Sequence, residues 1–227
     1  MNRHGCFVTG TDTGVGKTWV STALLLALAA RGVRAVGMKP VASGCEPTAD
    51  GLRNEDALAL QAASAGAPDY ALVNPYAFAP AIAPHLAARD VGVDIGFERI
   101  VERAGQLTAG GEFLLVEGAG GWRVPLGRDG DMAALACRLD LPVVLVVGLR
   151  LGCINHALLS AESIRAAGLR LAGWVGNTIE PQMPRLADNL ATLHASLPEP
   201  CLGVLPYSLG AVRPDSFAAL DVTCLLA

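Results

Sequence analysis

A glycine-rich loop near the start of the chain constrains the fold more than any other feature. Residues 10–18 read GTDTGVGKT, after the apolar run 6–9 and before a segment of helical length and spacing at 18–30. Glycines let successive backbone N–H groups turn toward phosphate oxygens, and the start of a helix adds positive potential. The strand, loop and helix in this order predict a phosphate-binding loop, or P-loop.

Five residues separate Gly10 from Gly16, one more than the strict P-loop pattern allows. The alternative is a tight glycine turn with a surface lysine, but the flanking strand and helix favour the phosphate loop. In that interpretation Lys17 brings positive charge to the β- and γ-phosphates, and Thr18 offers a hydroxyl to Mg²⁺.

The rest of the chain alternates between two kinds of segment. Unbroken apolar runs predict strands buried on both faces, at 6–9, 35–38, 113–116, 143–147, 171–175 and 201–205. Helical spacing occupies 18–30, 56–65, 97–107, 132–139, 155–167 and 185–196. This order predicts an α/β fold of the P-loop NTPase kind, with a doubly wound, mainly parallel sheet and helices on both faces. We expect one domain over 1–227, with 66–94 as an ordered loop near the site.

Composition excludes several classes of protein. With 17 Lys+Arg against 21 Asp+Glu, the net charge of −4 leaves no broad basic surface for nucleic acid. The apolar runs stop far short of the roughly 20 residues that span a bilayer. No charged leader with an apolar segment opens the sequence, so we expect a cytoplasmic protein. Six scattered cysteines without a C-x-x-C pair are expected to be reduced, mostly buried thiols.

Polar residues follow several of the predicted strands, where ligands of such folds collect. Glu117 ends the run 113–116, and Asp56 opens a predicted helix. Their carboxylates suit Mg²⁺, although a solvated strand-end acid and a helix N-terminal charge are the simpler alternatives. Lys39 follows another strand and would stabilise a phosphoryl group in transfer together with Lys17. Without the other motifs, Lys39 could equally be a solvated lysine.

A further segment, GLRLGCINH at 148–156, passes from a strand end into a helix. Its exposed N–H groups could bind an anionic substrate carboxylate. His156 is expected to cap or pack, so the mechanism need not include a histidine.

Several motifs together resemble the dethiobiotin synthetase family over nearly the whole chain. They are GTDTGVGKT at 10–18, KPVASG at 39–44, LRNEDALAL at 52–60, VNPY at 73–76, VEGAGGW at 116–122 and LGCINHA at 151–157. The resemblance implies an ATP- and Mg²⁺-dependent cyclo-ligase acting on 7,8-diaminononanoate and CO2. In that reaction a carbamate forms, ATP phosphorylates it, and the neighbouring amine closes the ring and expels phosphate.

The resemblance also assigns roles to residues. It implies Thr13, Lys17 and Lys39 around the transferring phosphate, with Ser43 on the substrate. Thr18, Asp56 and Glu117 would hold Mg²⁺. The implied nucleotide contacts are Gly14, Val15, Gly16, Lys17, Thr18, Trp19, Asp56, Glu117, Gly118, Ala119, Gly120, Asn177, Thr178, Pro206, Tyr207 and Ser208.

The resemblance further implies a homodimer with the substrate at the subunit boundary. Gly152, Cys153, Ile154 and Asn155 would there grip the carboxylate of substrate bound mainly in the other subunit. The chain departs from the family at Gly14, where an acidic residue is often found. It also departs at 209–213, which lacks a glutamate sometimes placed near the nucleotide.

Two other functions share the phosphate loop. A regulatory switch ATPase of the ParA/MinD kind has a related fold, but usually carries an additional lysine early in its loop, and residues 11–13 offer none. An amide-forming synthetase of cobalamin synthesis is expected to continue into a glutaminase domain well beyond residue 227.

Overall fold

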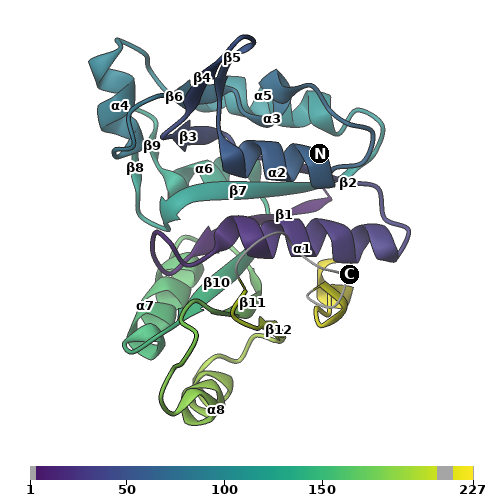
Figure 1. The fold of residues 1–227 in the computed structure, drawn as a ribbon, viewed down its shortest axis with the longest axis vertical. Helices are drawn as coiled ribbons and strands as arrows, with labels where there is room; N and C mark the ends of the chain where they lie inside the picture. The colour runs from purple at the N-terminus through teal and green to yellow at the C-terminus, as the bar shows by residue number, and fades with distance from the viewer. Residues whose placement is uncertain (1–3, 209–216, 227) are drawn as a thin grey trace.

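The computed structural model describes residues 4–208 and 217–226 and is built around a six-stranded sheet (Figure 1). The strand order is β12-β11-β10-β1-β7-β2, and every neighbouring pair is parallel. Its strands are β1 (Gly5–Gly10), β2 (Ala35–Met38), β7 (Phe113–Gly121), β10 (Val143–Leu149), β11 (Leu171–Thr178) and β12 (Cys201–Leu205). The predicted doubly wound parallel sheet is therefore confirmed. The departure noted at 209–213 lies outside the described residues.

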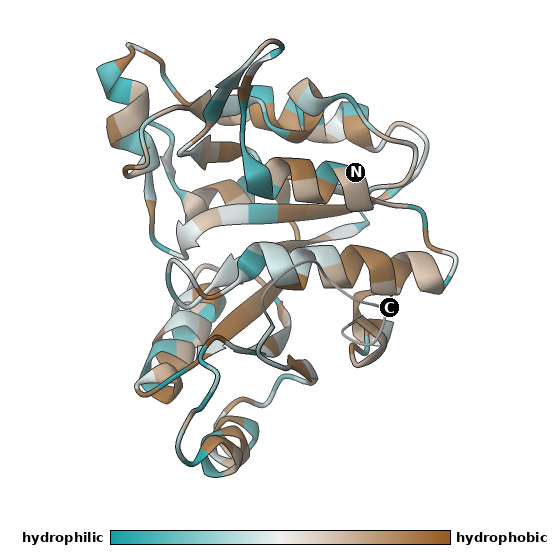
Figure 2. Ribbon diagram, in the orientation of Figure 1, coloured by the Kyte–Doolittle hydropathy of each residue, from teal (hydrophilic) through white to brown (hydrophobic). Residues whose placement is uncertain are grey.

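Helices cover both faces of this sheet because its strands are apolar on both sides. Successive strand residues point in opposite directions, so Phe7 packs into one core cluster while Cys6 and Val8 pack into the other. One cluster includes α1 (Lys17–Ala30), and the other includes α5 (Phe97–Leu107), α6 (Met132–Leu139), α7 (Cys153–Ala166) and α8 (Leu186–Ser196). In Figure 2, β7 turns from brown to paler colours toward its carboxyl end, where the glycine-rich segment lies.

Smaller elements gather beside β2, at the edge of the sheet. α2 (Glu55–Ala63) packs on β2 and α1. Three short pairings lie in separate two-stranded sheets, namely β3 (Val41–Ser43) with β6 (Tyr76–Phe78), β4 (Glu46–Thr48) with β5 (Gly51–Arg53), and β8 (Pro125–Gly127) with β9 (Gly130–Asp131). The remaining elements are α3 (Tyr70–Val73), α4 (Pro84–Asp90) and the 3₁₀ turn η1 (Thr223–Leu225).

Two sequence-based predictions were wrong in detail. Residues 66–94 are not a loop, since they form α3, β6 and α4, and β6 exists only because it pairs with the distant β3. Glu117 does not end its strand, because the pairing of β7 with β1 continues to Gly121 opposite Gly10. The strand therefore outlasts the apolar run from which its end was predicted, and Glu117 lies inside it.

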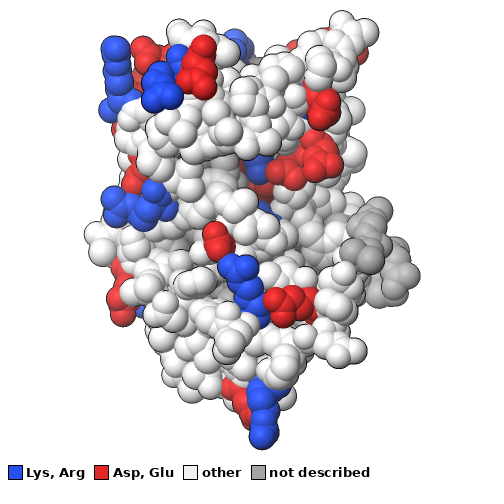
Figure 3. Space-filling model, turned by 60° about the vertical axis from the view of Figure 1, so that its left-hand side comes forward, with Lys and Arg blue, Asp and Glu red and all other residues white. Residues whose placement is uncertain are grey.

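The cysteines are free, as expected, but only half of them are buried. Figure 3 shows basic and acidic side chains interspersed on the face that it draws. All six cysteines are free, with Cys6, Cys45 and Cys153 buried and Cys137 exposed. Within the described ranges, we find no helix whose length and apolar character would let it cross a bilayer.

Candidate active site

A pocket of about 730 Å³ opens where the loop after β1 meets the ends of β2 and β7. This size falls in the range of small-molecule sites, and the position is the one expected for ligands of such sheets. Its lining comprises Thr13, Gly14, Gly16, Lys17, Thr18, Lys39, Ala42, Ser43, Asn54, Asp56, Ala81, Ile82, Ala83, Pro84, Glu117, Ala119, Gly120 and Val124.

The phosphate loop takes a conformation that requires glycine. Gly16 forms the N-cap of α1 with φ 78°, a left-handed value that side chains disfavour. A Cβ at Gly16 would also collide with the side-chain nitrogen of Asn177. That nitrogen donates a hydrogen bond to the carbonyl of Val15 at 2.9 Å, so the end of β11 supports the loop from behind.

Lys17 is buried at the start of α1, and its ammonium donates to the carbonyl oxygen of Asp12 at 3.2 Å. Burial, followed by the positive charge of Lys39, lowers the pKa of Lys17 to about 8, although nearby carboxylates act in the opposite direction. Lys17 therefore carries a poorly solvated positive charge that an anionic phosphate would stabilise.

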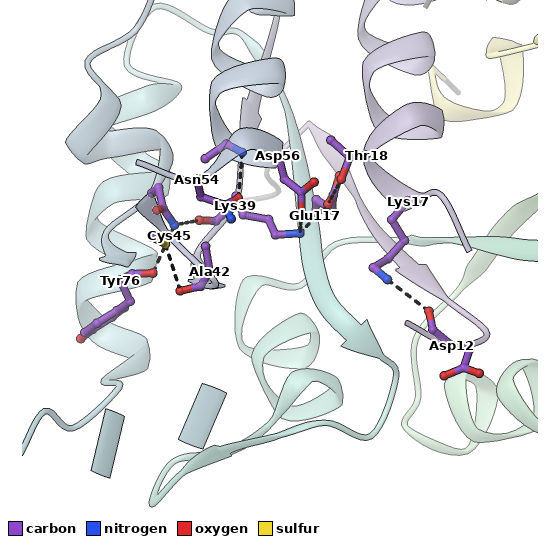
Figure 4. A network of polar contacts seen from close by, with 12 residues as sticks. Asp12, Lys17, Thr18, Lys39, Ala42, Cys45, Asn54, Asp56, Tyr76 and Glu117 are labelled. Atoms are coloured by element: carbon purple, nitrogen blue, oxygen red, sulfur yellow. Dashed lines mark hydrogen bonds and ion pairs between the residues drawn. The ribbon is translucent and has the colours of Figure 1, made fainter. Parts of the chain in front are cut away.

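Four side chains from four different elements meet beside this loop (Figure 4). The ammonium of Lys39, after β2, lies 2.6 Å from Glu117 Oε1 of β7 and 2.8 Å from Asp56 Oδ2 of α2. Thr18 of α1 donates its hydroxyl to the same oxygen of Glu117 at 2.8 Å. The lysine, the hydroxyl and the two acids that were predicted from strand and helix ends are therefore brought together.

Lys39 and Asp56 favour each other's ionised forms. Burial would lower the pKa of Lys39, but Glu117 and Asp56 outweigh it and raise that pKa above the ordinary value. Burial likewise opposes the charge of Asp56, yet Lys39 brings the pKa of its carboxyl below the usual range. Lysine and carboxylate therefore remain ionised near neutral pH.

The oxygen atoms at this point fit a magnesium ion in kind. Glu117 is fully buried, and its Oε2 accepts no hydrogen bond from the described residues. Asp56 and the Thr18 hydroxyl add further hard oxygen donors beside it. Among the described residues, no group of three or more His, Cys, Asp or Glu could hold a metal by itself. A metal here would thus use the hydroxyl and ligand oxygens besides the two carboxylates.

Two other predicted residues line the pocket. The hydroxyl of Ser43 is buried without a partner among the described residues, so a bound molecule could bond to it. Thr13 lies beside Gly120, and its backbone N–H donates to Asp12 Oδ1 at 2.7 Å.

The other predicted positions lie away from the pocket lining. Gly152 caps the start of α7, with Cys153 buried and Asn155 exposed. Gly118 packs against Phe7 in the core. The remaining predicted residues that do not line the pocket are Val15, Trp19, Ile154, Asn177, Thr178, Pro206, Tyr207 and Ser208.

Some residues of the site carried no recognisable signal in the sequence. An apolar wall at 81–84, with Val124, reaches the pocket through the β6–α4 segment, which confirms the expected position of 66–94 near the site although the sequence did not indicate these residues. Arg150, after β10, places its guanidinium 2.6 Å from Asp12 Oδ2 and so tethers the phosphate loop. Arg150 lies in the segment 148–156, but nothing in the sequence pairs it with Asp12.

Lys17→Met is expected to stabilise the nucleotide-free protein. The unfolded chain has an ordinary lysine pKa of 10.5 and the folded protein one of about 8, so the folded state binds this proton less tightly. The ammonium therefore lowers stability below about pH 8, and this loss disappears as the pH rises toward 10.5. Thermal unfolding without ATP or metal should show a higher Tm for the variant near neutral pH and a smaller difference at about pH 10. An equal gain at both pH values would contradict the assigned pKa.

Comparison with known proteins adds independent findings. Residues 4–214 match a family model described as an AAA domain. An ATP-dependent dethiobiotin synthetase BioD of Xanthomonas axonopodis pv. citri is 57% identical over 211 residues, covering 93% of this chain and 94% of that protein. The enzymes of that name from Chromohalobacter salexigens and Xylella fastidiosa are 57% and 53% identical, with 93% and 96% of this chain covered and 93% and 97% of theirs.

Solved structures with a similar fold are more distant. The MinC:MinD cell division complex of Aquifex aeolicus matches with a TM-score of 0.54 at 17% identity, covering 90% of this chain and 82% of that one. A ParA family ATPase from Chlorobium tepidum matches with a TM-score of 0.50 at 13% identity, covering 92% and 86%. At this identity the likeness shows the fold alone.

Proposed function

Since the chain belongs to the family of ATP-dependent dethiobiotin synthetases, we propose that the pocket between the phosphate loop and Lys39 is where it joins CO2 to a diamine. The chain is an ATP-dependent ligase that forms dethiobiotin from small-molecule substrates. The observation that carries the assignment to this pocket is the meeting of Lys39, Asp56 and Glu117 beside the loop of Lys17.

The proposed reaction has three steps. One amine of 7,8-diaminononanoate attacks CO2 and loses a proton to give a carbamate. A carbamate oxygen then attacks the γ-phosphorus of ATP and ADP leaves. Finally the second amine attacks the carbamate carbon and loses a proton, the bond from carbon to the phosphate oxygen breaks to release inorganic phosphate, and the urea ring closes.

Charge neutralisation and alignment are the main contributions of the protein. Lys17 and Lys39 line the same pocket, so that the two ammonium groups can offset the negative charge of the transferring phosphoryl group. Thr13 and Ser43 line the same pocket and would orient phosphate and substrate. Holding reactants in line can supply roughly 7–11 kcal/mol.

Magnesium is part of the proposal because oxygen donors of the right kind meet here. Thr18, Asp56 and Glu117 would hold it, and the orphaned Oε2 of Glu117 supports this role. When bound, the ion would neutralise phosphate charge and orient the γ-phosphate for attack. Lys39 already bonds to both carboxylates, so the protein can keep them ordered for such an ion.

The nucleotide is proposed to run from the phosphate loop toward the ends of β11 and β12. Gly14, Gly16 and the residues that follow them would hold the phosphates, with Glu117, Ala119 and Gly120 opposite. The hydrogen bond from Asn177 to Val15 brings the end of β11 to this loop, which supports the base site. That base site would comprise Asn177, Thr178, Pro206, Tyr207 and Ser208, with Val15, Trp19 and Gly118 as the further loop and strand contacts.

We also propose a cytoplasmic, single-domain homodimer that needs neither nucleic acid nor membrane. Leu151, two residues before α7 begins, is 94% exposed, and Leu159 on α7 is 57% exposed. Large apolar side chains in such positions are often covered by a partner. Gly152, Cys153, Ile154 and Asn155 follow Leu151, so this surface would bring the start of α7 to the substrate of the other subunit.

Leu151→Glu tests the dimer. A buried charge at an apolar interface should weaken association by at least about 10-fold and raise the KM for the diamine. Sedimentation velocity over a dilution series measures the first effect, and steady-state kinetics the second. Val91→Glu is the control, since Val91 is 59% exposed after α4 and outside this surface. Unchanged association in both variants would exclude α7 as the interface.

The function itself is tested by supplying purified protein with Mg-ATP, labelled bicarbonate and 7,8-diaminononanoate. We expect acid-stable label and ADP in equal amounts, and little ADP when the diamine is omitted. ATP hydrolysis indifferent to the diamine would instead favour a switch ATPase.

A further inference from the structure

A chain of buried hydrogen bonds leads away from the backbone of Lys39. The carbonyl oxygen of Lys39 accepts a bond from Asn74 Nδ2 at 2.7 Å. Asn74 Oδ1 in turn accepts the hydroxyl of Tyr70 at 3.1 Å, and that hydroxyl accepts the backbone N–H of Asn54 at 2.8 Å. Asn54 lies directly before α2.

The chain returns to its starting residue through α2. Asn54 Oδ1 accepts the N–H of Ala57 at 3.2 Å and so caps the helix. Asp56 lies in this first turn, and its Oδ2 reaches the ammonium of Lys39 at 2.8 Å. A ring therefore begins at the backbone of Lys39, passes through Tyr70 and the helix cap, and ends at the side chain of Lys39.

Apart from Asp56, the side chains of the ring are buried. Asn54, Asn74 and Tyr70 are exposed by 6%, 5% and 9% respectively. Buried polar groups that lose a partner cannot replace it with water, so each bond in such a ring constrains the next. The guanidinium of Arg53 lies over the ring of Tyr70 at 4.3 Å and further restricts it.

Asp56 depends on this support more than Glu117 does. The Asp56 side chain lines the pocket and is 35% exposed, whereas Glu117 is fully buried in an inner strand of the sheet. The position of the Asp56 carboxylate is therefore determined mainly by where α2 begins. Tyr70 bonds directly to the backbone of the residue that caps this helix.

We infer that Tyr70 and Asn74 are positioning residues that fix Asp56 against Lys39 for phosphoryl transfer. They touch neither ATP nor substrate in this inference, and act through α2 and the backbone of Lys39. The inference rests on the proposed function for its effect on catalysis. Its effect on Asp56 can be measured independently, through the contribution of Mg²⁺ to ADP binding.

Tyr76 provides a closely matched control. Its hydroxyl also accepts the backbone N–H of a helix N-cap, Gly96 before α5, at 2.9 Å. Arg99 lies over its ring at 4.8 Å, as Arg53 lies over that of Tyr70, and Tyr76 is 6% exposed. The difference is that no residue of α5 lines the pocket. Loss of the Tyr76 hydroxyl therefore reports the general cost of freeing the N–H at a helix start that lies away from the pocket.

The test compares Tyr70→Phe with Tyr76→Phe. Both should lower Tm, since each frees the backbone N–H of a helix N-cap, and Tyr70→Phe should lower it more because its N–H and the Asn74 Oδ1 that it also frees are buried. Only Tyr70→Phe should lower kcat, by at least about 10-fold, as found for groups that orient metal ligands. The KM for the diamine should change by less than about 2-fold, because no substrate contact is lost.

A double-mutant cycle with Asp56→Asn identifies the route of the effect. If Tyr70 acts through Asp56, adding Tyr70→Phe to Asp56→Asn should lower kcat by less than about 2-fold further. The inference would be overturned if the two kcat losses multiplied in the double variant. It would also be overturned if Tyr70→Phe and Tyr76→Phe lowered kcat equally.

Calorimetric titration of ADP separates this inference from the proposed reaction. Tyr70→Phe should weaken ADP binding with Mg²⁺ by at least about 5-fold and leave metal-free binding unchanged, since only the metal depends on Asp56. If Mg²⁺ strengthened ADP binding by the same factor in Tyr70→Phe as in the wild-type protein, the positioning role would be refuted. A wild-type protein without diamine-dependent ADP formation would instead refute the proposed function.

Discussion

Lys39→Ala is expected to lower turnover at least about 100-fold while leaving ATP binding largely intact. The phosphate loop and Lys17 remain to hold the nucleotide, because none of their hydrogen bonds passes through Lys39. The transferring phosphoryl group, however, loses a preorganised charge. Single-turnover ADP formation and ATP titration by calorimetry would separate the two effects.

This variant also disturbs a buried ion cluster, so folding needs its own control. Asp56 and Glu117 each lose their cationic partner, and Glu117 is fully buried. Arg165→Ala removes the cation of another short ion pair, 2.6 Å from Glu199 and outside the pocket. The control should keep full activity, and Lys39→Ala should still bind ATP in a folded state. Equal turnover with and without Lys39 would remove this residue from the mechanism.

Gly16→Ala is expected to weaken ATP binding at least about 100-fold, or about 3 kcal/mol. Alanine would be strained at the left-handed φ of 78°, and its methyl group would also collide with the side chain of Asn177. To relieve both, the loop must give up the bond between Asn177 and Val15 and redirect the N–H groups that would face phosphate. ATP titration of the purified variant measures this loss.

Gly32→Ala is the matched control for backbone strain. Gly32, after α1, has φ 77°, but a Cβ there would have no atom within 4 Å. It should lose about 1 kcal/mol of stability from the left-handed backbone and keep its ATP affinity. If Gly16→Ala bound ATP as well as Gly32→Ala, the phosphate loop would not hold the nucleotide as proposed.

The sheet was predictable because its signal is local. Apolar runs buried on both faces mark β2 and β12 at their true bounds, and the phosphate loop stands between β1 and α1 as predicted. The other four strands extend beyond their predicted runs, and the helices α5 and α6 have their predicted bounds, whereas some helix starts differ. α7 begins at Cys153 rather than 155, because its N-cap is the left-handed Gly152 and not a side-chain cap.

The site was predictable in its members but not in its bonds. The charged residue types at strand and helix ends indicated Lys39, Asp56 and Glu117. The sequence around each residue, however, does not show that the Lys39 ammonium bonds to both carboxylates. The ring through Tyr70 and Asn74 depends on contacts between distant segments. Residues of this kind read from the sequence only as core or turn positions.

The most direct test is a crystal structure of the protein with Mg²⁺, a non-hydrolysable ATP analogue and the diamine. We predict the ammonium groups of Lys17 and Lys39 within about 3.5 Å of γ-phosphate oxygens, with the metal on Thr18, Asp56 and Glu117. A γ-phosphate out of reach of Lys39, with that lysine still closed on its two carboxylates, would contradict the account.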